Sequence, residues 1–182
     1  MRIVIGGIFV AHGMQKLTGA FDGPGLGGTA KMMEKQRMYP PDRNALAVAL
    51  TETVGGAAIV LGAGMPAATA ATTAAMATAV KKVHVKNGFF NSNGGYEFNL
   101  ALVAATTAVT IDGPGPLSVD ALLGKHRWGV FWGLFGAWAG WIASSFAIEF
   151  GEDAARKAGA SAEPSSTETP ADAATGAAPA SR

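Results

Sequence analysis

The chain has 182 residues, of which 49% are hydrophobic, and its mean hydropathy is +0.24. This composition is more apolar than that of an ordinary soluble domain and points to a membrane protein, with the lipid bilayer as its first partner. The formal net charge of +1 provides no attraction for nucleic acid. Cysteine is absent, which excludes disulfides, thiolate nucleophiles, iron–sulfur clusters and cysteine zinc sites, and we expect no metal site.

Hydropathy predicts five transmembrane helices, each judged against the roughly 20 apolar residues that cross a bilayer. They are Arg2 to Leu17, Asn44 to Gly64, Ala67 to Val83, Tyr96 to Ile111 and Trp128 to Phe150. The first is interpreted as a retained anchor, since it lacks the pattern of a secretory signal. The third is rich in Ala and Thr and is expected inside the bundle, where small residues permit close contact. The predicted fold is an all-α, polytopic membrane bundle of four or five helices.

The fifth span differs from the others in its flanks and its glycines. Tryptophans lie toward its ends and centre, and its glycines form two G-x-x-x-G spacings that suit tight helix packing: Gly129, Gly133, Gly136 and Gly140. We therefore expect this helix to mediate homo-oligomerisation or to bind a partner. After Gly151 the chain is rich in Ala, Ser, Thr, Pro and acidic residues. This predicts a bundle over residues 1–151, with a core over 1–123 and an extra helix over 128–150, and a disordered tail over 152–182.

The connector between the first two spans has two features of note. Its glycine-rich stretch Gly23 to Gly28 has neither a preceding strand nor a Walker lysine, so nucleotide binding is not expected. Thr29 to Met38 could form a short interfacial helix ended by Pro40 and Pro41, or a structured connector, and we favour the connector.

Six polar residues lie in or at the ends of the predicted spans, where ionisable groups are costly unless they face a bundle interior. They are His12, Lys16, Glu52, His84, Glu97 and Asn99. Glu52 is expected to point inward, because Gly55 and Gly56 share its helix face and permit close approach of a neighbour. With alternating helices, all six lie toward one side of the membrane.

This cluster has two interpretations of equal weight. It could line a pocket for a polar headgroup such as a quinone, or for protons moving to and from one. Alternatively, the residues bridge helices and satisfy one another in a dry bundle. A haem held by His12 and His84 is the less favoured alternative, since only one such pair exists. Lys81, Lys82 and Lys86 are interpreted as topology signals near lipid phosphates.

The opening of the chain resembles the R-x-x-x-G-x-x-F-x-x-H-G-x-x-K-L pattern of the DoxX family of membrane proteins. The residues that carry this pattern are Arg2, Gly6, Phe9, His12, Gly13, Lys16 and Leu17. Further similar elements follow in order: Glu52 with Gly55 and Gly56, His84 with Phe89 and Phe90, Gly94 to Leu100, and Gly113 to Gly115 with Leu117 to Asp120. The resemblance extends to about Leu123, so the fifth helix and the tail lie outside it.

The resemblance implies a four-helix membrane core and a role as a membrane subunit of an oxidoreductase system, with a soluble or membrane-bound oxidoreductase as partner. The leading hypothesis is a subunit that binds a quinone or a small electron carrier at the six-residue cluster. A non-catalytic scaffold for partner enzymes is the second hypothesis. A small transporter ranks third, because no internal repeat is evident.

The distribution of basic residues predicts how the chain is oriented in the plasma membrane. With five alternating spans, Arg2, Lys125 and Arg127 lie on one side, while ten Lys and Arg residues lie in the loops and the tail start on the other. The basic side should be cytoplasmic.

Single cysteines introduced into this cysteine-free chain test that orientation. We expect cysteines in the loops Thr18 to Arg43 and Lys86 to Gly95 to stay unlabelled by an impermeant thiol reagent in intact cells. Both should be labelled after the membrane is permeabilised. Labelling of both loops in intact cells would show that they face the outside, which is the opposite of the predicted orientation.

Overall fold

The computed structural model describes residues 1–159, and these contain helices and no strand. The α-helices are α1 (Arg2–Thr18), α2 (Gly25–Lys35), α3 (Pro41–Leu61), α4 (Met65–Ala79), α5 (Glu97–Asp112), α6 (Val119–Leu122) and α7 (Gly129–Lys157). The remaining helical pieces are a π-helical turn over Val80–His84 and short 3-10 turns over Ala20–Asp22, Val85–Asn87 and Asn91–Asn93.

Each of the five predicted spans coincides with a long helix, and the boundaries shift by a few residues. The largest shift is at the end of α7, which continues to Lys157, so the first residues assigned to the tail are helical. The rest of the predicted disordered tail, residues 160–182, lies outside the described residues. Within the connector, a helix does form, but α2 begins at Gly25, earlier than the expected Thr29.

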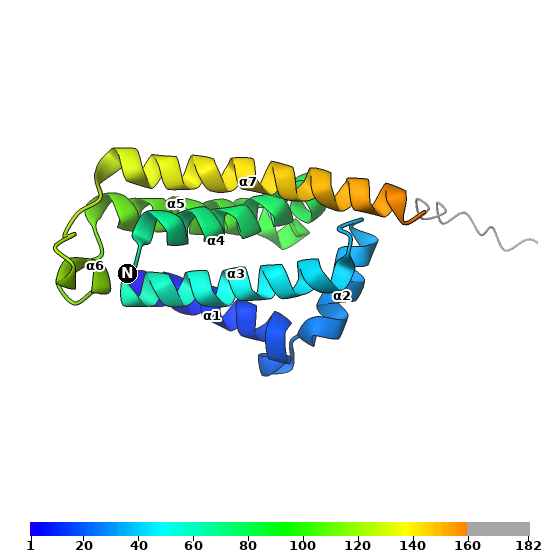
Figure 1. Ribbon diagram of the computed structural model, residues 1–182, viewed down its shortest axis with the longest axis horizontal. Coiled ribbons are helices and arrows are strands. Elements are labelled where there is room, and N and C mark those ends of the chain that lie inside the picture. The colour runs from blue at the N-terminus through cyan, green and yellow to red at the C-terminus, as the bar shows by residue number, and fades with distance from the viewer. Residues whose placement is uncertain (160–182) are drawn as a thin grey trace, which may run out of the picture.

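The five long helices run alternately up and down the bundle (Figure 1). The N-terminus, α6 and the start of α7 lie at one end, while α2 and the end of α7 lie at the other. Helix α4 contacts α3, α5 and α7, and it buries threonines and alanines, as its composition predicted. Because neighbouring helices are antiparallel, the polar residues at the ends of α1, α4 and the start of α5 gather at the α2 end.

Glycines permit the closest helix contact, which is between α1 and α3. A Cβ atom on Gly56 would lie 2.7 Å from the Gly6 carbonyl oxygen, and one on Gly6 would lie 2.6 Å from the Gly56 carbonyl oxygen. A side chain on Gly13 would collide with the Thr53 hydroxyl. The absence of side chains therefore lets the two backbones touch, and Phe9 and Ile59 are fully buried at the same contact.

The glycines of α7 pack inside the chain. A Cβ atom on Gly136 would lie 2.7 Å from the Pro66 carbonyl oxygen of α4, and one on Gly140 would meet the Ala70 carbonyl. Gly133 faces Thr107 and Ile111 of α5. The glycine face is thus already covered by α4 and α5. Any self-association through α7 has to use its exposed aromatic face, which includes Phe131, Trp138 and Trp141.

At the other end of the bundle, Asp120 of α6 forms hydrogen bonds with the start of α4 and with the residue that precedes α7. Its carboxylate, 4% exposed, accepts hydrogen bonds from the backbone N–H groups of Gly64 and Met65 at 2.7 and 3.1 Å. It also accepts one from the Trp128 indole at 2.7 Å. An anionic group at the start of α4 interacts favourably with the helix dipole, so Asp120 both caps α4 and positions the start of α7.

Within the described residues, two helices are long and apolar enough to cross a membrane: Pro41–Leu61 and Gly129–Lys157. Helices α1, α4 and α5 have 17, 15 and 16 residues. At about 1.5 Å per residue, each is roughly 22 to 26 Å long, slightly short of a typical hydrocarbon core of about 30 Å. Membrane crossing by these three helices stays a prediction.

The α4–α7 contact predicts that a large side chain is tolerated differently at two positions on α7 that lie three residues apart. Gly140→Leu should disrupt packing, because the new side chain enters the space of the Ala70 carbonyl. Overpacking of this kind costs about 1 to 3 kcal/mol or more. Ala143→Leu, at an exposed position on the same helix, is the matched control. The midpoint temperature of unfolding in detergent and the abundance in the membrane should both fall for Gly140→Leu and stay unchanged for Ala143→Leu. Equal values for the two variants would contradict this packing.

Candidate functional site

A cavity of about 390 Å³ lies at the α2 end of the bundle, enclosed by α1, α2, α3, α4 and α5. Five of the six predicted polar residues line it: His12, Lys16, Glu52, His84 and Asn99. The rest of the wall is largely apolar and includes Val48, Met76, Val83, Phe98 and Leu102. A few polar groups in a mainly apolar cavity are the usual character of a small-molecule site.

The centre of the polar group is an ion pair between Lys16 of α1 and Glu52 of α3. The Lys16 Nζ atom lies 2.5 Å from Glu52 Oε2, and the two side chains are 19% and 4% exposed. Lys16 Nζ also donates to the backbone oxygen of His12 at 3.4 Å. Glu52 was expected to point inward, and it does. Because the pair compensates two buried charges, removal of either partner would leave the other unsatisfied.

Asn99 and His84 supply two further polar groups to the cavity wall. Asn99 is 7% exposed, and its side-chain amide donates to the Met76 Sδ atom at 3.3 Å, a weak acceptor. His84 Nδ1 lies 2.7 Å from the Gly94 carbonyl oxygen. A carbonyl can only accept, so Nδ1 carries the proton in this contact, and Nε2 is the ring atom left for a ligand.

The sixth predicted residue, Glu97, does not line the cavity. Its carboxylate accepts a hydrogen bond from the backbone N–H of Asn91 at 2.7 Å. Glu97 therefore shapes the loop before α5, and that loop contributes Asn91 to the cavity wall. Sequence position alone placed Glu97 in the cluster because it opens α5. Its neighbour Asn99, two residues further on, is the one that faces the interior.

Sequence reasoning missed the contribution of α2. Met32, Met33 and Gln36 from this helix line the cavity, so the connector between the first two spans forms part of the site. The burial of Ala30 and Met33 in α2 shows how the helix is held against the bundle. The sequence allowed a short helix over Thr29 to Met38, but nothing in it indicated that such a helix packs over the cluster.

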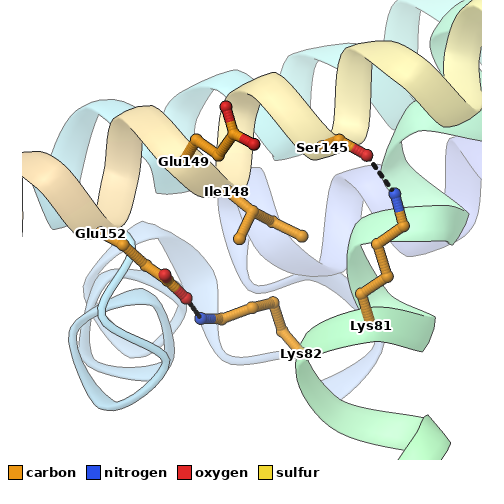
Figure 2. A pocket seen from close by; sticks show the side chains of 6 residues that line it. All are labelled: Lys81, Lys82, Ser145, Ile148, Glu149 and Glu152. Carbon is orange, nitrogen blue, oxygen red and sulfur yellow. Dashed lines mark hydrogen bonds and ion pairs between the residues drawn. The ribbon is translucent and has the colours of Figure 1, made fainter.

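The lysines at the end of α4 belong to a separate pocket, of about 390 Å³, between the π-helical turn and α7 (Figure 2). Lys82 Nζ lies 2.8 Å from Glu152 Oε1. Lys81 Nζ donates to the hydroxyls of Ser144 and Ser145 at 2.7 and 2.8 Å, and it lies 4.3 Å from the Trp141 ring centroid. Both lysines therefore connect α7 to α4.

The π-helical turn accounts for how one short segment serves both pockets. Val80–His84 directly continues α4, and a π turn holds more residues per turn than an α-helix, which re-aims its side chains. Lys81 and Lys82 reach α7, whereas Val83 and His84 line the cavity. Within the described residues, no three His, Asp or Glu side chains gather in a way that could hold a metal ion.

Comparison with known families defines the class of protein. The family model described as DoxX matches residues 1–85, which confirms the resemblance over these residues, while the similar elements from Phe89 to Asp120 lie beyond the match. The matched residues, a little under half of the chain, are similar to the DoxX family of membrane proteins. The match covers α1 to α4 and the π-helical turn after α4, the elements that contribute Lys16, Glu52 and His84. No curated protein and no solved structure matches the chain.

A double-mutant cycle tests whether Lys16 and Glu52 act as a buried pair. Lys16→Met and Glu52→Leu should each destabilise the protein in detergent, while the double variant should lose less than the sum of the two. We expect a coupling of about 1 to 3 kcal/mol, as for other contacting buried groups. The Lys82–Glu152 pair, with side chains 14% and 39% exposed, is the control and should couple by less than about 1 kcal/mol. Additive losses for Lys16 and Glu52 would show that the contact contributes nothing to the fold.

Proposed function

We propose that this protein is the membrane subunit of a redox system and binds a quinone, or a small electron carrier of similar chemistry, in the cavity between α1 and α5. The observation that carries the proposal is the gathering of Lys16, Glu52, His84 and Asn99 in one largely apolar cavity. A quinone combines an apolar ring with two carbonyl oxygens that accept hydrogen bonds. The ammonium of Lys16 and the amide of Asn99 are donors suited to such oxygens.

The polar residues also suit the proton chemistry of such a carrier. Reduction of a quinone to a quinol takes up two electrons and two protons. The chain offers three titratable groups on the cavity wall beside Lys16, namely His12, Glu52 and His84, which could hold or transfer protons. The electrons would come from a partner oxidoreductase, in keeping with the family resemblance. In this arrangement the protein binds and orients the carrier and supplies protons to it.

The alternative function is a scaffold that assembles partner enzymes. It is favoured by the fact that Lys16 and Glu52 already satisfy each other without a ligand. The basic loops and the aromatic face of α7 would then dock partners. The two functions differ in what the purified protein contains, because a scaffold retains proteins and a quinone-binding subunit retains an extractable small molecule.

Quinone binding to the protein in lipid nanodiscs tests the proposal. We expect extraction to yield a bound quinone, and Lys16→Gln to weaken quinone binding about 10- to 150-fold, as expected when a charged hydrogen bond worth roughly 1.5 to 3 kcal/mol is lost. Glu52→Gln keeps an oxygen that can accept from Lys16, so it should keep the fold, but it should reduce quinone-linked turnover with the native partner, because the amide cannot carry a proton.

Lys82→Gln is the matched control, since Lys82 is also ion-paired but does not line the cavity. It should leave quinone affinity unchanged. A well-folded protein that binds no quinone, and that co-purifies with a partner enzyme, would instead support the scaffold. Full turnover by Glu52→Gln at normal abundance would remove Glu52 from the proton-carrying residues.

A further inference from the structure

Two side chains of the cavity wall are also exposed on the outside of the bundle. Phe98 of α5 is 42% exposed and His12 of α1 is exposed, yet both line the cavity. Their rings meet edge to face, with centroids 6.4 Å apart and an angle of 63° between the planes. The His12–Phe98 pair therefore lies between the cavity and the outer surface, in the seam where α1 meets α5.

The bundle surface that runs from this pair along α1 and α5 toward the N-terminal end is apolar. From Phe98 to Ala108, the exposed residues of α5 are all apolar: Phe98, Leu100, Ala101, Ala104 and Ala108. On α1 the exposed residues before His12 are Ile3 and Val4. In a membrane protein, such faces contact lipid. An ionisable side chain on a lipid-facing surface is costly unless it faces a cavity or a polar partner, and His12 meets that condition by lining the cavity.

We infer that the His12–Phe98 pair forms a lateral portal, through which an amphiphile with a carbonyl-bearing ring and a long apolar chain passes between the bilayer and the cavity. The inference rests on the proposed function and specifies the ligand and its route. The ring would pass inward toward Lys16 and Glu52, while the chain stays among the lipids. The portal can open by rotation of the exposed Phe98 ring, since exposed side chains change rotamer within nanoseconds.

A second route has to be distinguished, because Met32 of α2 is 36% exposed and also lines the cavity. A ligand entering beside α2 would come from the aqueous side of the bundle end. A lateral portal instead predicts that Phe98 contacts both lipid and the bound amphiphile. Leu100 offers a matched control, since it is 52% exposed on the same helix but does not line the cavity.

The cysteine-free chain allows a direct test with three variants in nanodiscs: Phe98→Cys, Leu100→Cys and Met32→Cys. Each is labelled with a membrane-dissolved maleimide and with a water-soluble maleimide, with and without a decyl-substituted benzoquinone. Binding of the same quinone to each variant is measured separately by equilibrium partition. At ten times its Kd the quinone fills about nine-tenths of the sites, so a protected cysteine should react about tenfold more slowly.

The portal predicts that Phe98→Cys reacts with the membrane-dissolved reagent and is protected by the quinone, while Leu100→Cys reacts equally with and without it. If the quinone binds but Phe98→Cys is unprotected, or if only Met32→Cys is protected and only from the water-soluble reagent, the lateral route is wrong and the proposed function stands. If no variant and no native protein binds the quinone, the proposed function fails and the portal fails with it.

Discussion

Gly6, Gly13 and Gly56 let α1 and α3 approach until backbone meets backbone, and this contact determines where the polar groups of the cavity lie. The last turn of α1 is brought beside the middle of α3, so Lys16 reaches Glu52 at 2.5 Å. A larger side chain at any of the three glycines would separate the helices. It would also pull apart the ion pair, because a lysine on one helix and a glutamate on the other can meet only at a short interhelical distance.

The ion pair in turn makes a polar cavity tolerable inside an apolar bundle. Glu52 is 3% exposed, and a lone carboxylate at such a site would carry a large desolvation cost. Lys16 offsets that cost, and two further polar groups on the wall have partners of their own, namely the Gly94 carbonyl for His84 and Met76 Sδ for Asn99. The resulting cavity combines a few polar groups with a largely apolar lining, which is the usual character of a small-molecule site.

Helix α7 lies beyond the part of the chain that matches the DoxX model, yet it is built into the bundle. Its glycine face packs on α4 and α5, Asp120 fixes its start, and Lys81 and Lys82 hold its second half. The π-helical turn that carries these lysines also carries His84. Movement of α7 relative to α4 would therefore act on the same turn that positions His84 at the cavity.

The sequence by itself determined the five long helices, the inward direction of Glu52 and the resemblance to the DoxX family. These features depend on the length of each apolar stretch, on glycine spacing along one helix, and on short motifs. Each of these signals is contained in residues that are close together in the sequence. The sequence also placed all six polar residues at the same end of the bundle, because alternating helices bring every second loop to the same side, and five of the six line the cavity.

Only the tertiary structure decided which of these residues share a wall. Glu97 and Asn99 are two residues apart, but the rotation of α5 turns Asn99 into the cavity and leaves Glu97 to cap Asn91. It likewise decided that the α7 glycines pack within the chain, and that Met33 of α2 closes the site. Rotation and partner choice depend on packing between helices distant in sequence, and no single helix contains that information.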